Sequence, residues 1–285
     1  MPLLRLLAFA LLPLTTLCAG EFETALEHFK ARRYPEAHAA FSAVAAAEPK
    51  NAAVRHYLGR VCARRNDAAA LEEAVKWYGE AVELEPGNAT YLAAYGGALL
   101  NAANRSRSLS GANKGRDMLE KAVALDPAQL DAREALFRFY HHAPWPIGSG
   151  TKARAHLAEL RKHDPERATV LSIISRVDDK DYTGAFKVCD ELIAAQPDHY
   201  TALYQYGRTA AVSGQNLERG LARLRQCVAL SPPSPASPPH SAVWNRIGNL
   251  EEKLQRPAAA RTAYETALQL EPGNRQAKDA LARLK

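Results

Sequence analysis

Cysteine and aromatic residues are scarce in this sequence. Aromatic side chains make up 7% of its 285 residues, and there are only four cysteines. Small scaffolds stapled by disulfides need more cysteines at closer spacing. We therefore predict that Cys62, Cys189 and Cys227 are small apolar core residues, with pairing of two of them as the alternative. Alanine and leucine are abundant and β-branched residues sparse, which favours helices over sheets.

Long runs of basic charge are also missing. The chain has 37 lysines and arginines against 31 acidic residues, for a formal net charge of +6, and the charges are well mixed. A nucleic-acid-binding protein needs a basic stripe or a clustered basic face. The densest basic stretches here, such as Arg32-Arg33 and Arg64-Arg65, are short. We predict no nucleic-acid partner.

Recognisable catalytic motifs are missing as well. The sequence has no P-loop, no glycine-rich dinucleotide motif, no His-Glu-x-x-His and no nucleophile elbow. His141 and His142 are adjacent, but neighbouring helix residues point about 100° apart and do not share a metal ion from one helix face. The sequence therefore predicts no enzyme, no catalytic residue, no metal site and no cofactor.

Residues 1–19 differ from the rest of the chain. Arg5 precedes a short apolar stretch that ends in small residues, which is the order of a secretory signal peptide. The apolar part is interrupted by Pro13 and is too short for a membrane span. We predict cleavage after Ala19 and a location in the periplasm or outside the cell. A lipid anchor at Cys18 and an uncleaved N-terminal anchor are the alternatives.

One pattern recurs along the remainder of the chain. A polar residue and a proline close each alanine- and leucine-rich run at intervals of 37, 41, 38, 32, 35 and 40 residues, at Pro49, Pro86, Pro127, Pro165, Pro197, Pro232 and Pro272. Twelve residues before each proline stands a small residue: Ala37, Ala74, Gly115, Ala153, Ala185, Gly220 and Ala260. Four residues further on stands a larger one: Phe41, Tyr78, Leu119, Leu157, Cys189, Leu224 and Tyr264. Because two helices cross closely only where bulk is missing, this period predicts a repeated pair of helices.

Four glycines mark the first helix of a pair: Gly59, Gly96, Gly207 and Gly248. A glycine inside a helix costs about 0.8–1.0 kcal/mol relative to alanine. Its repetition at matched positions therefore predicts close contact between the two helices. The most regular unit spans 241–274 and resembles the tetratricopeptide repeat family through Trp244, Ile247, Gly248, Ala260, Tyr264, Ala267 and Pro272.

The resemblance implies an all-α fold: an α-solenoid, or superhelix, of about seven helix-turn-helix repeats with a C-terminal capping helix. The predicted domains are a signal peptide at 1–19, repeats one to six at 20–230, a proline-rich linker at 231–240, and repeat seven with the capping helix at 241–285.

Three insertions interrupt the repeats. The polar, glycine- and serine-rich stretch 104–115 predicts a long loop inside repeat three, and 142–150 predicts an extended turn in repeat four. The linker at 231–240 reads SPPSPASPPH, and proline at that density favours an extended, semi-rigid segment. The last repeat is therefore expected to be displaced from the first six or to hinge against them.

The first helices of such a solenoid line its concave side, which is the surface that repeat proteins use for partners. Two positions on that face predict a peptide-binding groove made of Arg60, Arg138, Arg176, Arg208, His56, Tyr204, Asn245 and Asn249. Arginine binds carboxylates through paired hydrogen bonds, so the predicted partner is a protein or peptide, acidic or bearing a carboxylate. The alternative is a set of scattered, solvated arginines, because Glu134 forms a favourable local pair with Arg138. The lysine and asparagine pairs of some family members' carboxylate clamps are not found here.

Two functions compete at this point. The leading hypothesis is a non-catalytic scaffold outside the cytoplasm that holds a protein or peptide in its concave groove. The alternative is an assembly component of a cell-envelope complex that docks through the convex face or the last repeat. Fold alone does not decide between them.

Overall fold

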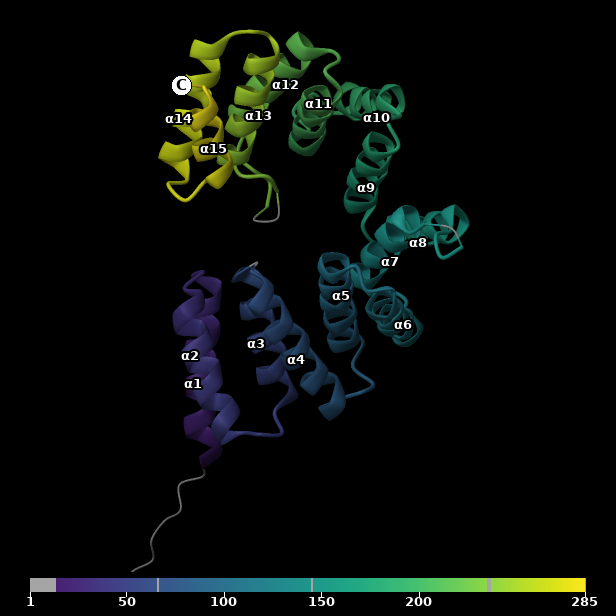
Figure 1. Ribbon diagram of the computed structural model, residues 1–285, viewed down its shortest axis with the longest axis vertical. Helices are drawn as coiled ribbons and strands as arrows, with labels where there is room; N and C mark the ends of the chain where they lie inside the picture. The colour runs from purple at the N-terminus through teal and green to yellow at the C-terminus, as the bar shows by residue number, and fades with distance from the viewer. Residues whose placement is uncertain (1–13, 66, 145, 235–236, 285) are drawn as a thin grey trace, which may run out of the picture. The chain divides into compact units, whose positions relative to one another are not determined.

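The computed structural model describes residues 14–65, 67–144, 146–234 and 237–284, with the side chains of 14–19 left out. Most of the predicted signal peptide, residues 1–13, lies outside the described residues. The described part of the chain forms fifteen α-helices and no strand (Figure 1). Their bounds are α1 Leu14–Lys30, α2 Tyr34–Ala47, α3 Ala52–Arg65, α4 Ala68–Leu84, α5 Ala89–Ser106, α6 Leu109–Leu125, α7 Leu130–His142, α8 Gly150–His163, α9 Pro165–Asp178, α10 Tyr182–Ala195, α11 Tyr200–Ser213, α12 Leu217–Val228, α13 His240–Lys253, α14 Pro257–Leu270 and α15 Arg275–Arg283.

Consecutive helices pack as pairs, from α1 with α2 to α13 with α14, and α15 packs on the last pair. This confirms the predicted α-solenoid class, with seven pairs and a capping helix among the described residues. The chain divides into two compact units. Unit 1 ends at His163 and contains α1–α8, drawn in purple to teal in Figure 1, and unit 2 runs from Asp164 and contains α9–α15, drawn in teal to yellow.

The repeated glycines lie where the helices of a pair touch, as predicted. A Cβ atom added to Gly96 would lie 2.7 Å from Leu119 Cγ and 2.8 Å from the backbone oxygen of Gly115. The other three added Cβ atoms would likewise be too close to the large residue of the partner helix, with nearest distances of 2.7 Å at Gly59 to Tyr78, 2.2 Å at Gly207 to Leu224 and 2.5 Å at Gly248 to Tyr264. The large residue of each second helix therefore occupies the space that the glycine leaves.

The small residues twelve positions before the prolines are all buried, which confirms their predicted role at the helix crossings. The prolines end helices as expected, because proline cannot continue the hydrogen-bond ladder. Six of the second helices end two residues before their proline, and α12 ends four before Pro232. Pro165 also forms the first turn of α9, behind the N-cap Asp164.

The predicted long loop at 104–115 is wrong. Helix α5 continues to Ser106, and only Arg107 and Ser108 separate it from α6. Arg107 adopts a left-handed backbone conformation with φ 55°, and the Ser108 hydroxyl accepts a hydrogen bond from the Gly111 amide at 3.1 Å. Such a side-chain cap lets a helix begin in a serine- and glycine-rich stretch. The extended turn predicted for repeat four is confirmed by the break between α7 and α8.

Helix α13 follows the proline-rich segment and packs on the preceding repeats of unit 2. Val243, Ile247 and Leu250 belong to one apolar core together with residues of α10, α11 and α12, such as Leu203 and Leu224. The segment itself is attached at two points: the Tyr200 hydroxyl donates to the Pro238 carbonyl at 2.6 Å, and the His240 ring lies 2.7 Å from the Leu230 carbonyl.

Helix α15 covers the end of unit 2. Ala277 and Ala280 are buried against Tyr264 and the alanines of α14. Cys62, Cys189 and Cys227 are buried free thiols, as the core prediction required. Within the described residues, no helix has the length and apolarity needed to cross a membrane.

Candidate functional site

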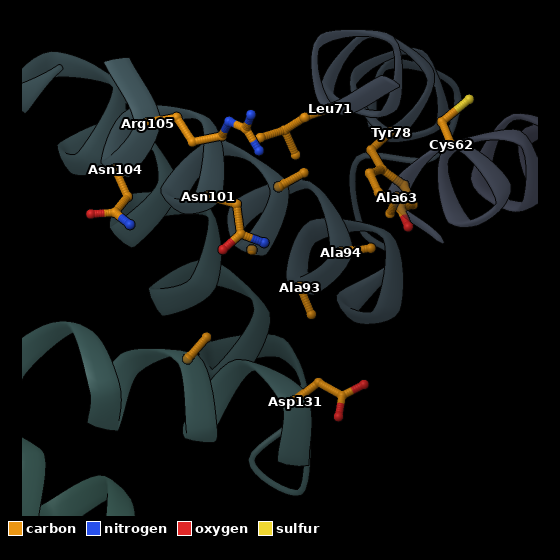
Figure 2. A pocket seen from close by; sticks show the side chains of 13 residues that line it. Cys62, Ala63, Leu71, Tyr78, Ala93, Ala94, Asn101, Asn104, Arg105 and Asp131 are labelled. Carbon is orange, nitrogen blue, oxygen red and sulfur yellow. The ribbon is translucent and has the colours of Figure 1, made fainter. Parts of the chain in front are cut away.

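A hollow of about 470 Å³ opens in unit 1 on the side formed by first helices (Figure 2). Helix α5 lies at its centre, with α3 and α4 on one side and α7 on the other. We call it the α5 hollow, and its lining residues are Cys62, Ala63, Leu71, Tyr78, Ala93, Ala94, Gly97, Ala98, Asn101, Asn104, Arg105, Asp131 and Ala135. Its volume lies within the range of ligand-binding clefts, about 300–1,000 Å³.

The hollow exists because α5 has small residues on this face. Ala93 and Gly97 are one helical turn apart, and a Cβ atom added to Gly97 would meet nothing within 4 Å. The neighbouring Gly96 points about 100° away around the helix, into the contact with α6. Adjacent glycines therefore have separate roles: one allows two helices to touch, and the other keeps the hollow open.

Polar groups surround this small-residue floor. Asn101 and Asn104 are exposed amides, each with donor and acceptor atoms, and Arg105 is an exposed guanidinium. Asp131 of α7 adds a carboxylate. In Figure 2 the Arg105 side chain extends toward the side of the hollow where Leu71 lies. The set can hydrogen-bond an extended peptide backbone and can pair with a carboxylate at Arg105.

The predicted groove residues of unit 1 contact other side chains. His56 is 8% exposed, and its ring centroid lies 4.9 Å from that of Tyr91 and 5.5 Å from that of Tyr78. Burial, followed by the nearby Arg60 charge, lowers the pKa of His56 to about 4. The Arg60 guanidinium lies 4.8 Å from the Phe29 ring centroid. Arg138 pairs with Glu134 at 2.9 Å, which is the local pair that the alternative interpretation expected.

The predicted groove residues of unit 2 are also in contact with neighbours. Tyr204 and Asn245 are 8% and 3% exposed, and the Asn245 amide donates to Asn274 Oδ1 at 3.0 Å. Asn249 donates to the Tyr264 hydroxyl at 2.7 Å. Arg176 pairs with Asp181 at 2.6 Å.

Arg208 of α11 is half-buried and stands at the position that Gly97 holds in α5. The four predicted arginines are divided between the units, with Arg60 and Arg138 in unit 1 and Arg176 and Arg208 in unit 2. Whether they bind a ligand stays a prediction.

The polar residues of the α5 hollow were not among the predicted groove residues. Asn101 lies four residues after Gly97 and therefore shares its helix face, and Asp131 lies seven residues before Arg138 on the same face of α7. Extending the groove register by one turn in each direction would have found both. Arg105 had no such signal, because the stretch around it was expected to be a loop.

A second polar cluster includes Cys62 but not the polar residues of the α5 hollow. His38 of α2, Cys62 of α3 and Glu73 of α4 place a ring nitrogen, a thiol sulfur and a carboxylate oxygen within 4.8 Å of one another. His38 Nε2 is 3.1 Å from Glu73 Oε1, and Trp77 Nε1 donates to the same oxygen at 3.4 Å. Burial, followed by the Glu73 charge, raises the pKa of the Cys62 thiol to about 12. Burial alone would raise the pKa of Glu73, but hydrogen bonds from His38, Trp77 and Cys62 lower it.

Comparisons with known proteins agree with this architecture. The sequence profile of the tetratricopeptide repeat matches residues 22–89, and a second profile of the same repeat matches residues 241–274. A search of curated proteins finds no match.

Solved structures similar to the chain include a tetratricopeptide repeat protein from Parabacteroides merdae, with 16% identity and a TM-score of 0.62 over 94% of this chain and 98% of that one. PilW, a type IV pilus biogenesis factor, matches at 15% identity and a TM-score of 0.46 over 93% of this chain and 98% of its own. At these identities the likeness concerns the fold.

The stacked helix pairs, the glycine contacts inside them and the two profile matches lead to one assignment. The fold is the type that serves protein-interaction scaffolds. The chain carries tetratricopeptide repeats at residues 22–89 and 241–274, and its fold is that of a tetratricopeptide repeat protein.

Proposed function

We propose that this chain is an exported, non-catalytic scaffold that binds a segment of another protein in the α5 hollow. The observation that carries the proposal is the hollow itself, which joins an open floor at Ala93 and Gly97 to the polar side chains of Asn101 and Arg105. A bound segment in extended conformation needs partners for its backbone N–H and C=O groups, and the two asparagine amides offer both kinds. A carboxylate on the segment would pair with Arg105.

Peptide binding to the purified chain tests this site. Arrays of short acidic, neutral and basic peptides would identify ligands, and titration would give their dissociation constants. A Cβ atom at Gly97 meets nothing within 4 Å, so Gly97→Leu should fill the hollow and abolish binding while the helical circular dichroism stays unchanged. Arg105→Ala should weaken acidic ligands about tenfold or more, because a charged hydrogen bond contributes about 1.5–3 kcal/mol.

A matched control is Leu109→Ala, an exposed residue of α6 that does not line the hollow. The Leu109→Ala variant should bind the same peptides with unchanged dissociation constants. Ligands that bind Gly97→Leu as tightly as the original chain would contradict the proposed site.

Export is tested separately, since it rests on the pattern of residues 1–19. The proposal expects a purified native chain whose first residue is Gly20, and mass spectrometry of the N-terminal peptide measures this. A lipid-modified Cys18 would replace the proposed soluble form with an anchored one, and an intact N-terminus would contradict cleavage.

A further inference from the structure

The cluster of His38, Cys62 and Glu73 combines the three ligand types that zinc prefers in proteins. The ligands come from three consecutive helices, α2, α3 and α4, and thus from both the first and the second repeat. Both second-helix residues are next to the small residue of their repeat: His38 follows Ala37 of repeat one, and Glu73 precedes Ala74 of repeat two.

The spacing of the cluster is close to that of a tetrahedral site. Two nitrogen or oxygen ligands at about 2.0–2.1 Å from a zinc ion are about 3.3 Å apart, and a sulfur ligand is about 3.6 Å from either. The 3.1 Å between His38 Nε2 and Glu73 Oε1 already matches the first value. Because the three ligand atoms lie within 4.8 Å, a side-chain movement of about 1 Å brings the thiol into place.

Charge balance favours a divalent ion in this position. A thiolate, a carboxylate and a neutral imidazole together carry two negative charges, which a divalent cation neutralises. Without an ion the Cys62 thiol is protonated, because it is fully buried beside the Glu73 carboxylate. Metal binding would release that proton to solvent, as thiol ligation generally does.

Solvent reaches the cluster from one side. The side chains of His38 and Glu73 are 32% and 34% exposed, whereas Cys62 is fully buried. An ion would therefore enter past the histidine and carboxylate and keep a water molecule as its fourth ligand. The nearby Arg65 lies 3.7 Å from Glu73 Oε2, on the oxygen that does not face His38, and it also contacts Asp67 at 3.6 Å.

We propose that His38, Cys62 and Glu73 form a binding site for Zn²⁺ that links the first two repeats. Helix α2 contributes one ligand and the α3–α4 pair contributes two, so a bound ion ties α2 to its neighbours. The site lies apart from the polar rim of the α5 hollow, and in Figure 2 the Cys62 sulfur points away from Asn101 and Arg105. Cys62 itself also lines the hollow, but His38 and Glu73 do not, so zinc binding can be measured without a peptide.

Titration of the tag-free full chain with Zn²⁺ and Co²⁺ tests the proposal, in a Cys18→Ala background that removes the N-terminal thiol. One equivalent of Co²⁺ should give a thiolate-to-cobalt charge-transfer absorption and should quench the fluorescence of Trp77, which donates to Glu73. Saturating Zn²⁺ should raise the thermal midpoint in a concentration-dependent way. Absence of stoichiometric binding of either ion overturns the proposal.

Substitutions distinguish zinc binding by three ligands from zinc binding by a single thiol. His38→Gln preserves a hydrogen-bonding side chain at a half-buried position and should weaken Zn²⁺ binding by at least about tenfold, as should Glu73→Gln. Cys62→Ala should abolish the charge-transfer absorption. The matched control is Cys189→Ala in unit 2, an equally buried thiol whose loss should leave binding unchanged. Unchanged affinity in His38→Gln, or loss of binding in Cys189→Ala, overturns the proposal.

Discussion

Helices α5 and α11 are the first helices of repeats three and six, and their sequences align on Gly96 and Gly207. Both glycines contact the large leucine of their second helix. On the face that lies next to this contact, α5 carries Ala93 and Gly97, whereas α11 carries Tyr204 and Arg208. Small side chains leave a hollow in unit 1, while the tyrosine in unit 2 is part of the core. One scaffold thus yields two different surfaces, and the residues next to the shared glycine decide which.

The largest expected change in the free energy of unfolding comes from truncating a core leucine in either unit, and it tests whether the two units are stabilised by separate cores. Leu119 in unit 1 and Leu224 in unit 2 hold matched positions and are fully buried. Replacing either with alanine should cost about 2–5 kcal/mol, because the glycine beside it cannot fill the cavity. Hydrogen exchange measured by mass spectrometry should accelerate in α5 and α6 for Leu119→Ala and in α11 and α12 for Leu224→Ala. Equal acceleration in both units for either variant would contradict separate cores.

Acid pH should destabilise unit 1 through protonation of His56, which is buried there. Its folded-state pKa of about 4 lies below the ordinary value of 6.5, so the unfolded chain binds the proton first. The stabilising contribution is therefore complete above pH 6.5 and is lost as the pH falls from 6.5 to 4, up to about 3 kcal/mol. Urea unfolding across that range should show the loss, and His56→Phe, which keeps the aromatic contacts, should reduce it. An equal pH dependence in the variant would assign the effect elsewhere.

The two adjacent glycines of α5 provide the next test. Gly96→Ala forces a Cβ atom against the backbone of Gly115, while Gly97→Ala adds one in open space. Overpacking costs about 1–3 kcal/mol, whereas alanine at an unhindered helix position gains about 0.8–1.0 kcal/mol. In urea unfolding, the free energy of unfolding of Gly96→Ala should therefore be lower than that of Gly97→Ala by about 1 kcal/mol or more. Similar stability of the two variants would mean that the α5–α6 contact adjusts readily.

The smallest expected effect concerns the predicted arginine row. Arg176 is 43% exposed and pairs with the equally exposed Asp181, and such pairs contribute about 0–1 kcal/mol. Arg176→Ala should therefore change the unfolding midpoint little and leave peptides selected at the α5 hollow bound with the same affinity. A fall in their affinity would restore the arginine row as part of the binding surface.

The repeat architecture could be predicted from the sequence because it depends on local signals, namely the prolines that end helices and the glycines at helix contacts. Each proline ends a helix by itself, and each of the four glycines contacts a large residue of the next helix, 16 to 23 positions further along the chain. The loop expected at 104–115 failed for a related reason: composition indicated flexibility, whereas one side chain, Ser108, caps a new helix.

The candidate sites were harder to predict from the sequence. The α5 hollow requires three first helices to be placed beside one another, and the absence of a side chain at Gly97 has no signal of its own. The His38–Cys62–Glu73 cluster joins residues up to 35 positions apart, on three helices. Cys62 was predicted only as a core thiol, because no short motif connects it to His38 or Glu73.

Gly96 and Gly97 also bear on how such a protein can acquire new partners. A Cβ atom at position 97 meets nothing within 4 Å, so variation there would change the depth and chemistry of the α5 hollow while Gly96 keeps the helix contact next door. A combinatorial library restricted to the floor of the hollow would therefore sample many specificities on an intact frame. The position that can accept a side chain and the position that cannot are neighbours along the backbone, but they point about 100° apart around one helix.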